Sequence, residues 1–284
     1  RETRARHRGS TGNCPEGGRQ ATSNERRRSA SRLWMRPESF GPVLCADWLA
    51  QLLCAYKLQP GTIVGSNTYS ENYSVGEELL HAITHGIGIP LSIAALAVLV
   101  GFSVLYGDAW HVTSTAIYGV TLILLYTAST LYHSIPHIQA KAILQQLDHA
   151  AIFLLIAGTY TPFTLVPLRG PWGWTLFALV WCIAIVGICV ELCGSSKLRR
   201  WSLALYLGMG WLVVVAIKPM LESVETGGLL LLLGGGLAYS LGAIFYAWER
   251  LSYNHAIWHV FVLAGSILHF FSVLFYVVPN GPLA

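Results

Sequence analysis

Long apolar runs separated by short polar connections fill the chain from about residue 79 onward. Seven runs can be delimited, at about 79–105, 112–133, 144–166, 174–192, 203–217, 229–248 and 257–278, and the fifth is the shortest. Most approach the ~20 apolar residues with which an α-helix crosses the hydrocarbon core of a bilayer. Barrel strands would instead alternate apolar and polar positions. The pattern therefore predicts an all-α integral membrane protein, a seven-transmembrane-helix bundle.

Composition separates this bundle from the first part of the chain. Charged residues make up only 11% of the sequence, against about 25% in a typical soluble domain. Residues 1–60 nevertheless hold eleven basic and five acidic residues. We therefore expect a basic, disordered N-terminal extension over 1–70 and a membrane domain over 71–284. A targeting leader is an alternative reading of the Arg- and Ser-rich start, although Glu2, Glu16 and Glu25 are unlike such leaders.

The basic residues between the runs predict an orientation. If the N-terminus is cytoplasmic, the cytoplasmic loops contain Lys141, Lys197, Arg199, Arg200 and Arg250, and the outer loops contain only Arg169 and Lys218. Cytoplasmic loops of membrane proteins are enriched in Lys and Arg. We therefore expect a cytoplasmic N-terminus, an outer C-terminus and a multipass protein of the plasma (inner) membrane.

Five polar residues fall at the same predicted membrane face. They are Ser129 and His133 at the end of the second run, Asp148 at the start of the third, and His255 and His259 at the start of the seventh. Ionisable residues in membrane segments are costly and mark functional sites by default. The topology therefore allows these residues from distant parts of the chain to form one buried site.

The spacing of the histidines suits a metal ion. His255 and His259 are four residues apart, so both project from one face of a helix. With His133 they would supply three imidazoles and leave a fourth position open, which is the layout of a catalytic zinc site. Ser129 and Asp148 would then hold or deprotonate a bound water. The alternative is that each histidine is an interfacial residue or forms a hydrogen bond between helices.

Several stretches carry a family resemblance. They are residues 77–88, residues 129–133 with 147–150 and 158–162, and residues 255–270. Together they resemble the hemolysin III family, which is related to the progestin and adipoQ receptors and more distantly to alkaline ceramidases. The resemblance covers about residues 72–278. It implies a seven-helix fold with a cytoplasmic N-terminus and an intramembrane zinc. The resemblance assigns the zinc to His133, His255 and His259, and it assigns support of the water to Ser129 and Asp148.

One position departs from the family pattern. The family usually has Asn where this chain has His81, so that Glu77, His81 and His85 form a stripe on one helix face. These three residues are candidates for a second layer around the site. His81 could contribute to a second metal site, or it could replace the hydrogen bond of an amide, and we favour the hydrogen bond.

Three functions fit these residues. The first is a zinc-dependent hydrolase that acts on a lipid amide or ester, with Asp148 as general base. The second is a cytolytic, pore-forming or channel protein, and the third is a receptor-like lipid sensor with a structural zinc. Membrane lipids are the expected partners in each case. A nucleic-acid partner is not expected, because the apolar runs leave no room for a binding module and the basic start alone would bind weakly.

Overall fold

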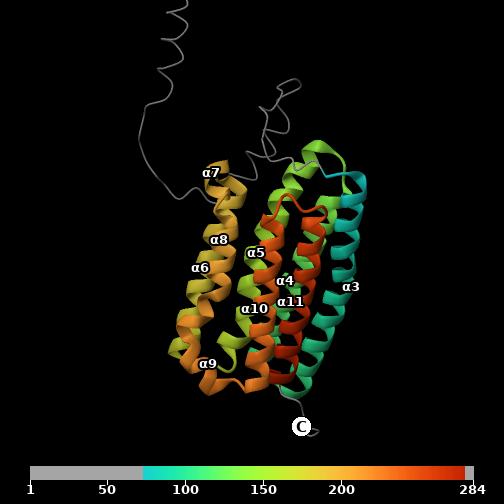
Figure 1. The fold of residues 1–284 in the computed structure, drawn as a ribbon. Helices are drawn as coiled ribbons and strands as arrows, with labels where there is room; N and C mark the ends of the chain where they lie inside the picture. Colours follow the sequence, from blue (N-terminus) through green and yellow to red (C-terminus); the bar gives the residue numbers. More distant parts are fainter. Residues whose placement is uncertain (1–72, 279–284) are drawn as a thin grey trace, which may run out of the picture. The chain divides into compact units, whose positions relative to one another are not determined.

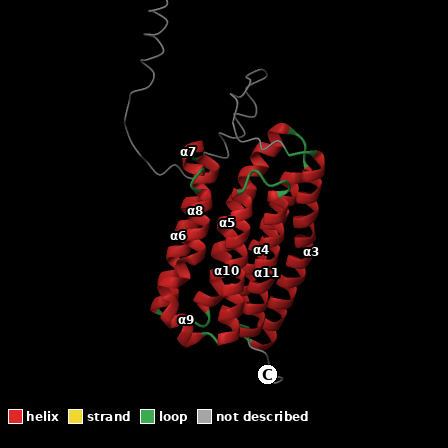
Figure 2. Ribbon diagram, viewed as in Figure 1, coloured by secondary structure: helices red, strands yellow, loops and turns green. Residues whose placement is uncertain are grey.

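The computed structural model describes residues 73–278, which are helical almost throughout (Figures 1 and 2). Its six continuous long helices are α3 (Val75–Tyr106), α4 (Ala109–Ser134), α5 (Ile138–Leu165), α6 (Pro171–Cys193), α10 (Thr226–Ala247) and α11 (Asn254–Tyr276). Between α6 and α10 lie α7 (Ser196–Arg199), α8 (Ser202–Gly210), a 3-10 helix (Trp211–Ala216) and α9 (Ile217–Ser223).

Seven helical stretches of the described chain are long and apolar enough to cross a membrane. The predicted all-α bundle with seven spans is therefore confirmed. The orientation of its ends stays a prediction. The expected disorder of residues 1–70 falls outside the described residues.

The helices pack mainly against their neighbours in sequence, and α11 also packs against α3. The last helix of the bundle thus lies beside the first (Figure 1). Helix α5 contributes to two apolar clusters, with Leu155 facing α4 and α11 and Phe153 facing α6 and α8. Helix α4 ends at Ser134 and α5 begins at Ile138, so the start of α5 lies next to the end of α4.

Every span begins at least three residues earlier than its apolar run predicted. Helix α3 starts at Val75 because Ser74 caps it, with the Glu77 carboxylate accepting a 2.8 Å hydrogen bond from the Ser74 backbone N–H. Such a capping box satisfies N–H groups that the first turn leaves free. Similarly, α5 starts at Ile138 and α11 at Asn254. The first turns are polar, so hydropathy alone does not show them.

The fifth span is longer than predicted and is not a regular helix. It extends over Lys197–Ser223, against the predicted 203–217, and contains the 3-10 segment. The backbone at this break is supported by Tyr160 of α5. Its hydroxyl donates to the Gly210 carbonyl at 2.8 Å and accepts from the Val213 N–H at 2.9 Å. Irregular backbone at membrane depth requires such a protein partner.

Helices α3 and α4 come together at Gly88. A Cβ at this position would lie 2.3 Å from Cδ1 of the Tyr126 ring. The absence of a side chain at Gly88 therefore allows the Tyr126 ring to pack directly against the backbone of α3. The same ring meets His85 edge-on, with their centroids 5.1 Å apart, so this close approach also shapes the surroundings of the predicted site.

Candidate metal site

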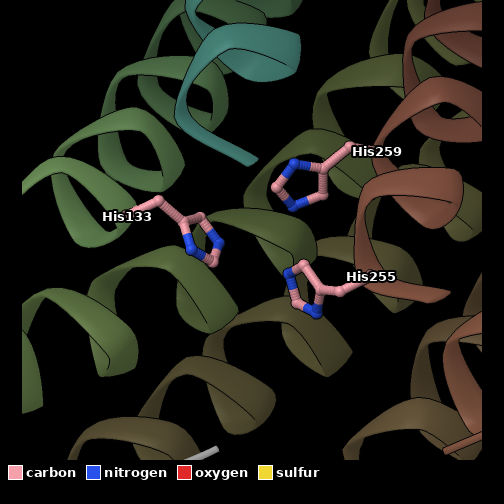
Figure 3. A group of neighbouring side chains, drawn as sticks. All are labelled: His133, His255 and His259. Carbon is pink, nitrogen blue, oxygen red and sulfur yellow. The ribbon is translucent and has the colours of Figure 1, made fainter. Parts of the chain in front are cut away.

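Three histidines from two helices face one another inside the bundle (Figure 3). His133 lies in the last turn of α4, and His255 and His259 lie one turn apart at the start of α11. The centroid of the His133 ring lies 5.1 Å from that of His255 and 5.2 Å from that of His259. The centroids of the His255 and His259 rings are 4.6 Å apart. One ring nitrogen of each lies within 4.8 Å of those of the other two. The structure thus brings together the three histidines that the sequence singled out.

Acceptor oxygens fix the tautomers of two of these rings. Nδ1 of His133 lies 2.7 Å from Oε2 of Glu78, and Nδ1 of His259 lies 3.2 Å from the backbone carbonyl oxygen of His81. An ionised carboxylate and a carbonyl oxygen can only accept, so Nδ1 carries the proton in both rings. The other nitrogen, Nε2, then carries the lone pair. In His133 this Nε2 atom is buried and has no hydrogen-bond partner among the described residues.

The third ring is oriented in the same way. Nδ1 of His255 lies 3.0 Å from the hydroxyl of Tyr73. Nδ1 of His259 has a second polar neighbour besides the His81 carbonyl, because the Thr84 hydroxyl lies 3.1 Å away. Figure 3 shows one nitrogen of each ring facing the other two rings. Metal-binding histidines are typically held by an outer nitrogen in this manner. The three residues therefore fit a metal ion, with Nε2 as the ligand atom of His133 and His259.

Asp148 of α5 and Ser129 of α4 are a buried carboxyl and a buried hydroxyl on neighbouring helices. They lie close enough for Ser129 to influence the Asp148 carboxyl. Ser129 lies one helical turn before His133 and therefore on the same face of α4. Asp148 is not among the ligands of the three-histidine group. This arrangement suits a proton acceptor better than a metal ligand.

The three predicted second-layer residues have different surroundings. His85 stacks on His259, with centroids 3.5 Å apart and rings almost parallel. Glu77 instead caps α3. His81 lies 4.7 Å from the His133 ring, and within residues 73–278 neither of its buried ring nitrogens has a hydrogen-bond partner. The favoured interpretation of His81 as a replacement for an amide hydrogen bond stays a prediction, with no such bond to support it.

Three contacts at the site were not predicted. Glu78 holds His133, Lys141 lies with Nζ 2.8 Å from Oε1 of Glu78, and Tyr73 holds His255. A signal for Glu78 was present, because Glu78 lies three residues before His81 and therefore on the same helix face. Lys141 lies in the polar first turn of α5 and Tyr73 lies just before α3, both outside the apolar runs, so no periodicity marks them.

A second buried polar cluster lies on the far side of α5. Glu191 of α6 accepts a hydrogen bond from the hydroxyl of Ser202, and its Oε2 lies 3.8 Å from Nδ1 of His149. The Tyr206 hydroxyl donates to the backbone carbonyl of His149 at 2.9 Å. His149 therefore joins α5 to α6 through its side chain and to α8 through its backbone carbonyl.

Comparisons with known proteins agree with this architecture. Residues 73–270 match the family described as "Haemolysin-III related". "Hemolysin-3" of Bacillus cereus is 53% identical over 207 residues, which cover 73% of this chain and 94% of that protein. "Hemolysin-3 homolog" of Bacillus subtilis is 50% identical over 206 residues, covering 72% of this chain and 97% of the relative.

A more distant relative comes from animals. The "Monocyte to macrophage differentiation factor" of Homo sapiens is 28% identical over 203 residues, covering 69% of this chain and 83% of that protein. The family match contains every residue of the histidine group, from Tyr73 to His259. With its seven spans, the chain belongs to the haemolysin III-related family of multipass membrane proteins.

Proposed function

We propose that this protein is an intramembrane zinc-dependent hydrolase that cleaves an amide or ester bond of a membrane lipid. The observation that carries the proposal is the fixed tautomer of His133 and His259, which turns their Nε2 lone pairs towards one point. Neutral imidazole is a ligand that suits zinc. Three such ligands leave room for a fourth, as catalytic zinc sites do.

The proposed chemistry combines the ion with two residues of the chain. A bound zinc ion would polarise the substrate carbonyl and lower the pKa of a water molecule. Asp148 accepts the proton of the attacking water, while the Ser129 hydroxyl orients the carboxylate. The water oxygen forms a bond to the carbonyl carbon, the bond from this carbon to nitrogen or oxygen breaks, and the proton held by Asp148 passes to the leaving group.

A lipid is the substrate that fits the position of this site. The histidines lie in helices that are apolar enough to span a membrane, and they are buried within the bundle. A reacting bond near a lipid headgroup would reach this depth. Because Lys and Arg are enriched in cytoplasmic loops, we propose that this end of the bundle faces the cytoplasm at the plasma membrane.

Metal analysis and lipid turnover test this function together. We expect the purified full chain to bind zinc, and we expect His133→Ala and His259→Ala to lose it. Asp148→Asn should keep the metal and lose hydrolysis across a panel of ceramides and glycerolipids. A control is His269→Asn, because His269 is buried in α11 about 15 Å along the helix from His259. Stoichiometric zinc in both alanine variants would overturn the proposal, as would full zinc without turnover, which would favour a lipid sensor with structural zinc.

Cytolysis is a second candidate function, because the name "Hemolysin-3" belongs to a relative 53% identical to this chain. Dye release from liposomes distinguishes it from hydrolysis. Release that is undiminished in His133→Ala would support a cytolytic or channel activity that does not depend on the metal. Release that requires both His133 and Asp148 would instead follow from lipid cleavage.

A further inference from the structure

A second group of potential ligands adjoins the three histidines and shares one of them. Glu78, His81 and His133 each offer one ligand atom, and these atoms lie within 4.8 Å of one another. A carboxylate and two imidazoles form a ligand set that occurs at zinc sites of enzymes. The site is therefore larger than the three histidines alone.

His81 is the residue that points most strongly to a ligand. His81 is 0% exposed, and neither nitrogen of its ring has a hydrogen-bond partner in the part of the chain that the structure describes. A buried polar group without a partner destabilises the fold, and such groups call for an explanation by an ion or a water. The ring is surrounded by other rings, with centroids 4.6 Å from Tyr73, 4.7 Å from His133 and 4.8 Å from His255. A metal ion bound to one nitrogen of the His81 ring would supply the partner that this nitrogen lacks.

Solvent exposure differs between the two groups. The Glu78 side chain is 18% exposed, whereas the His133 side chain is 0% exposed. An ion arriving from the polar end of the bundle would meet the Glu78 carboxylate before it met the shielded nitrogens. Glu78 thus forms the accessible edge of the combined site, whereas His81 is as deeply buried as the three histidines.

Charge argues against two ions at once. Glu78 already pairs with the ammonium of Lys141, with Nζ 2.8 Å from Oε1. Two divalent cations that share one imidazole next to this ammonium would repel one another strongly in a buried site. We propose that Glu78, His81 and His133 form a loading position for a divalent metal ion, from which the ion passes to His133, His255 and His259. The proposal rests on the metal site of the proposed function.

Zinc-binding kinetics and residual zinc binding test this proposal on the full chain in detergent. Apoprotein is mixed with Zn²⁺ and a chromophoric chelator, and both the rate and the equilibrium of zinc uptake are measured. We expect His81→Asn and His81→Gln to slow uptake by at least about tenfold and to change the equilibrium affinity far less. His269→Asn is the matched control and should load at the normal rate.

Two multiple variants separate the loading position from the deeper site. The variant His255→Ala/His259→Ala should retain one weakly bound zinc, and the further change His81→Asn should abolish it. Loading of both His81 variants at the normal rate, or equal residual binding in the double and triple variants, would overturn the loading position and leave the three-histidine site intact. Normal zinc affinity in the double variant would instead overturn the three-histidine site.

Discussion

Nδ1 of His133 lies 2.7 Å from Oε2 of Glu78, so a carboxylate of α3 sets the orientation of a histidine of α4. We expect Glu78→Ala to lower zinc affinity about 10- to 100-fold, because outer-layer carboxylates fix ring orientation and raise the basicity of the ligand. Competition with a chelator measures the change. Glu77→Ala is the matched control, since Glu77 caps α3 and does not bond His133. Equal zinc affinities in the two variants would contradict the orienting role of Glu78.

Tyr160 supports the break in the fifth span through its hydroxyl. We expect Tyr160→Phe to lower the free energy of unfolding by about 1–3 kcal/mol, because the Val213 N–H and the Gly210 carbonyl lose a buried partner. Unfolding in mixed micelles with increasing SDS measures the change. Tyr106→Phe serves as the control, because Tyr106 lies at the end of α3 and is 41% exposed. An unchanged midpoint in Tyr160→Phe would show that the break needs no support from α5.

Gly88 allows close packing of α3 against Tyr126. We expect Gly88→Ala to destabilise the bundle by about 1–3 kcal/mol, because the new methyl group would overlap the ring and force a shift. Gly101→Ala in the same helix is the control, since a Cβ there meets nothing within 4 Å. Thermal unfolding of the two variants should therefore differ in midpoint. Identical midpoints would mean that the Tyr126 ring moves without cost.

Tyr253, just before α11, has a left-handed backbone with φ of 61°. This conformation costs an L-residue other than glycine roughly 1–2 kcal/mol. We expect Tyr253→Gly to raise the free energy of unfolding by about 1 kcal/mol while the zinc content stays constant. Tyr253→Ala separates the two effects, because it removes the ring and keeps the strain. Stability that falls equally in both variants would show that the ring outweighs the backbone.

Hydropathy was sufficient to predict the seven spans, because burial in lipid requires long apolar runs. It did not define the ends of these helices. The capping box at Ser74 and the early start of α11 at Asn254 depend on polar residues. The break at Gly210 was not predicted either, since its support comes from Tyr160, some fifty residues earlier in the chain.

The histidine group was predictable for a different reason. His255 and His259 share a helix face by spacing alone, and span order placed His133 at the same end of the bundle. The contacts that orient these rings were not predictable, because Tyr73 and Glu78 reach them across helix boundaries. His81 shows the limit most clearly. Its missing hydrogen bonds become visible only when the neighbouring rings are in place.

The hydrogen bond between Tyr73 and His255 joins residues 182 positions apart. This separation has a consequence for biosynthesis, because spans are delivered to the membrane in order from the N-terminus. His133 and Glu78 can meet as soon as α4 is inserted, whereas the remaining ligands arrive only with the last helix. Metal capture at the three histidines would therefore report that the whole chain has been inserted. A translation product truncated before α11 would lack His255 and His259. It would therefore fail to retain the ion, which would distinguish it from the full-length protein.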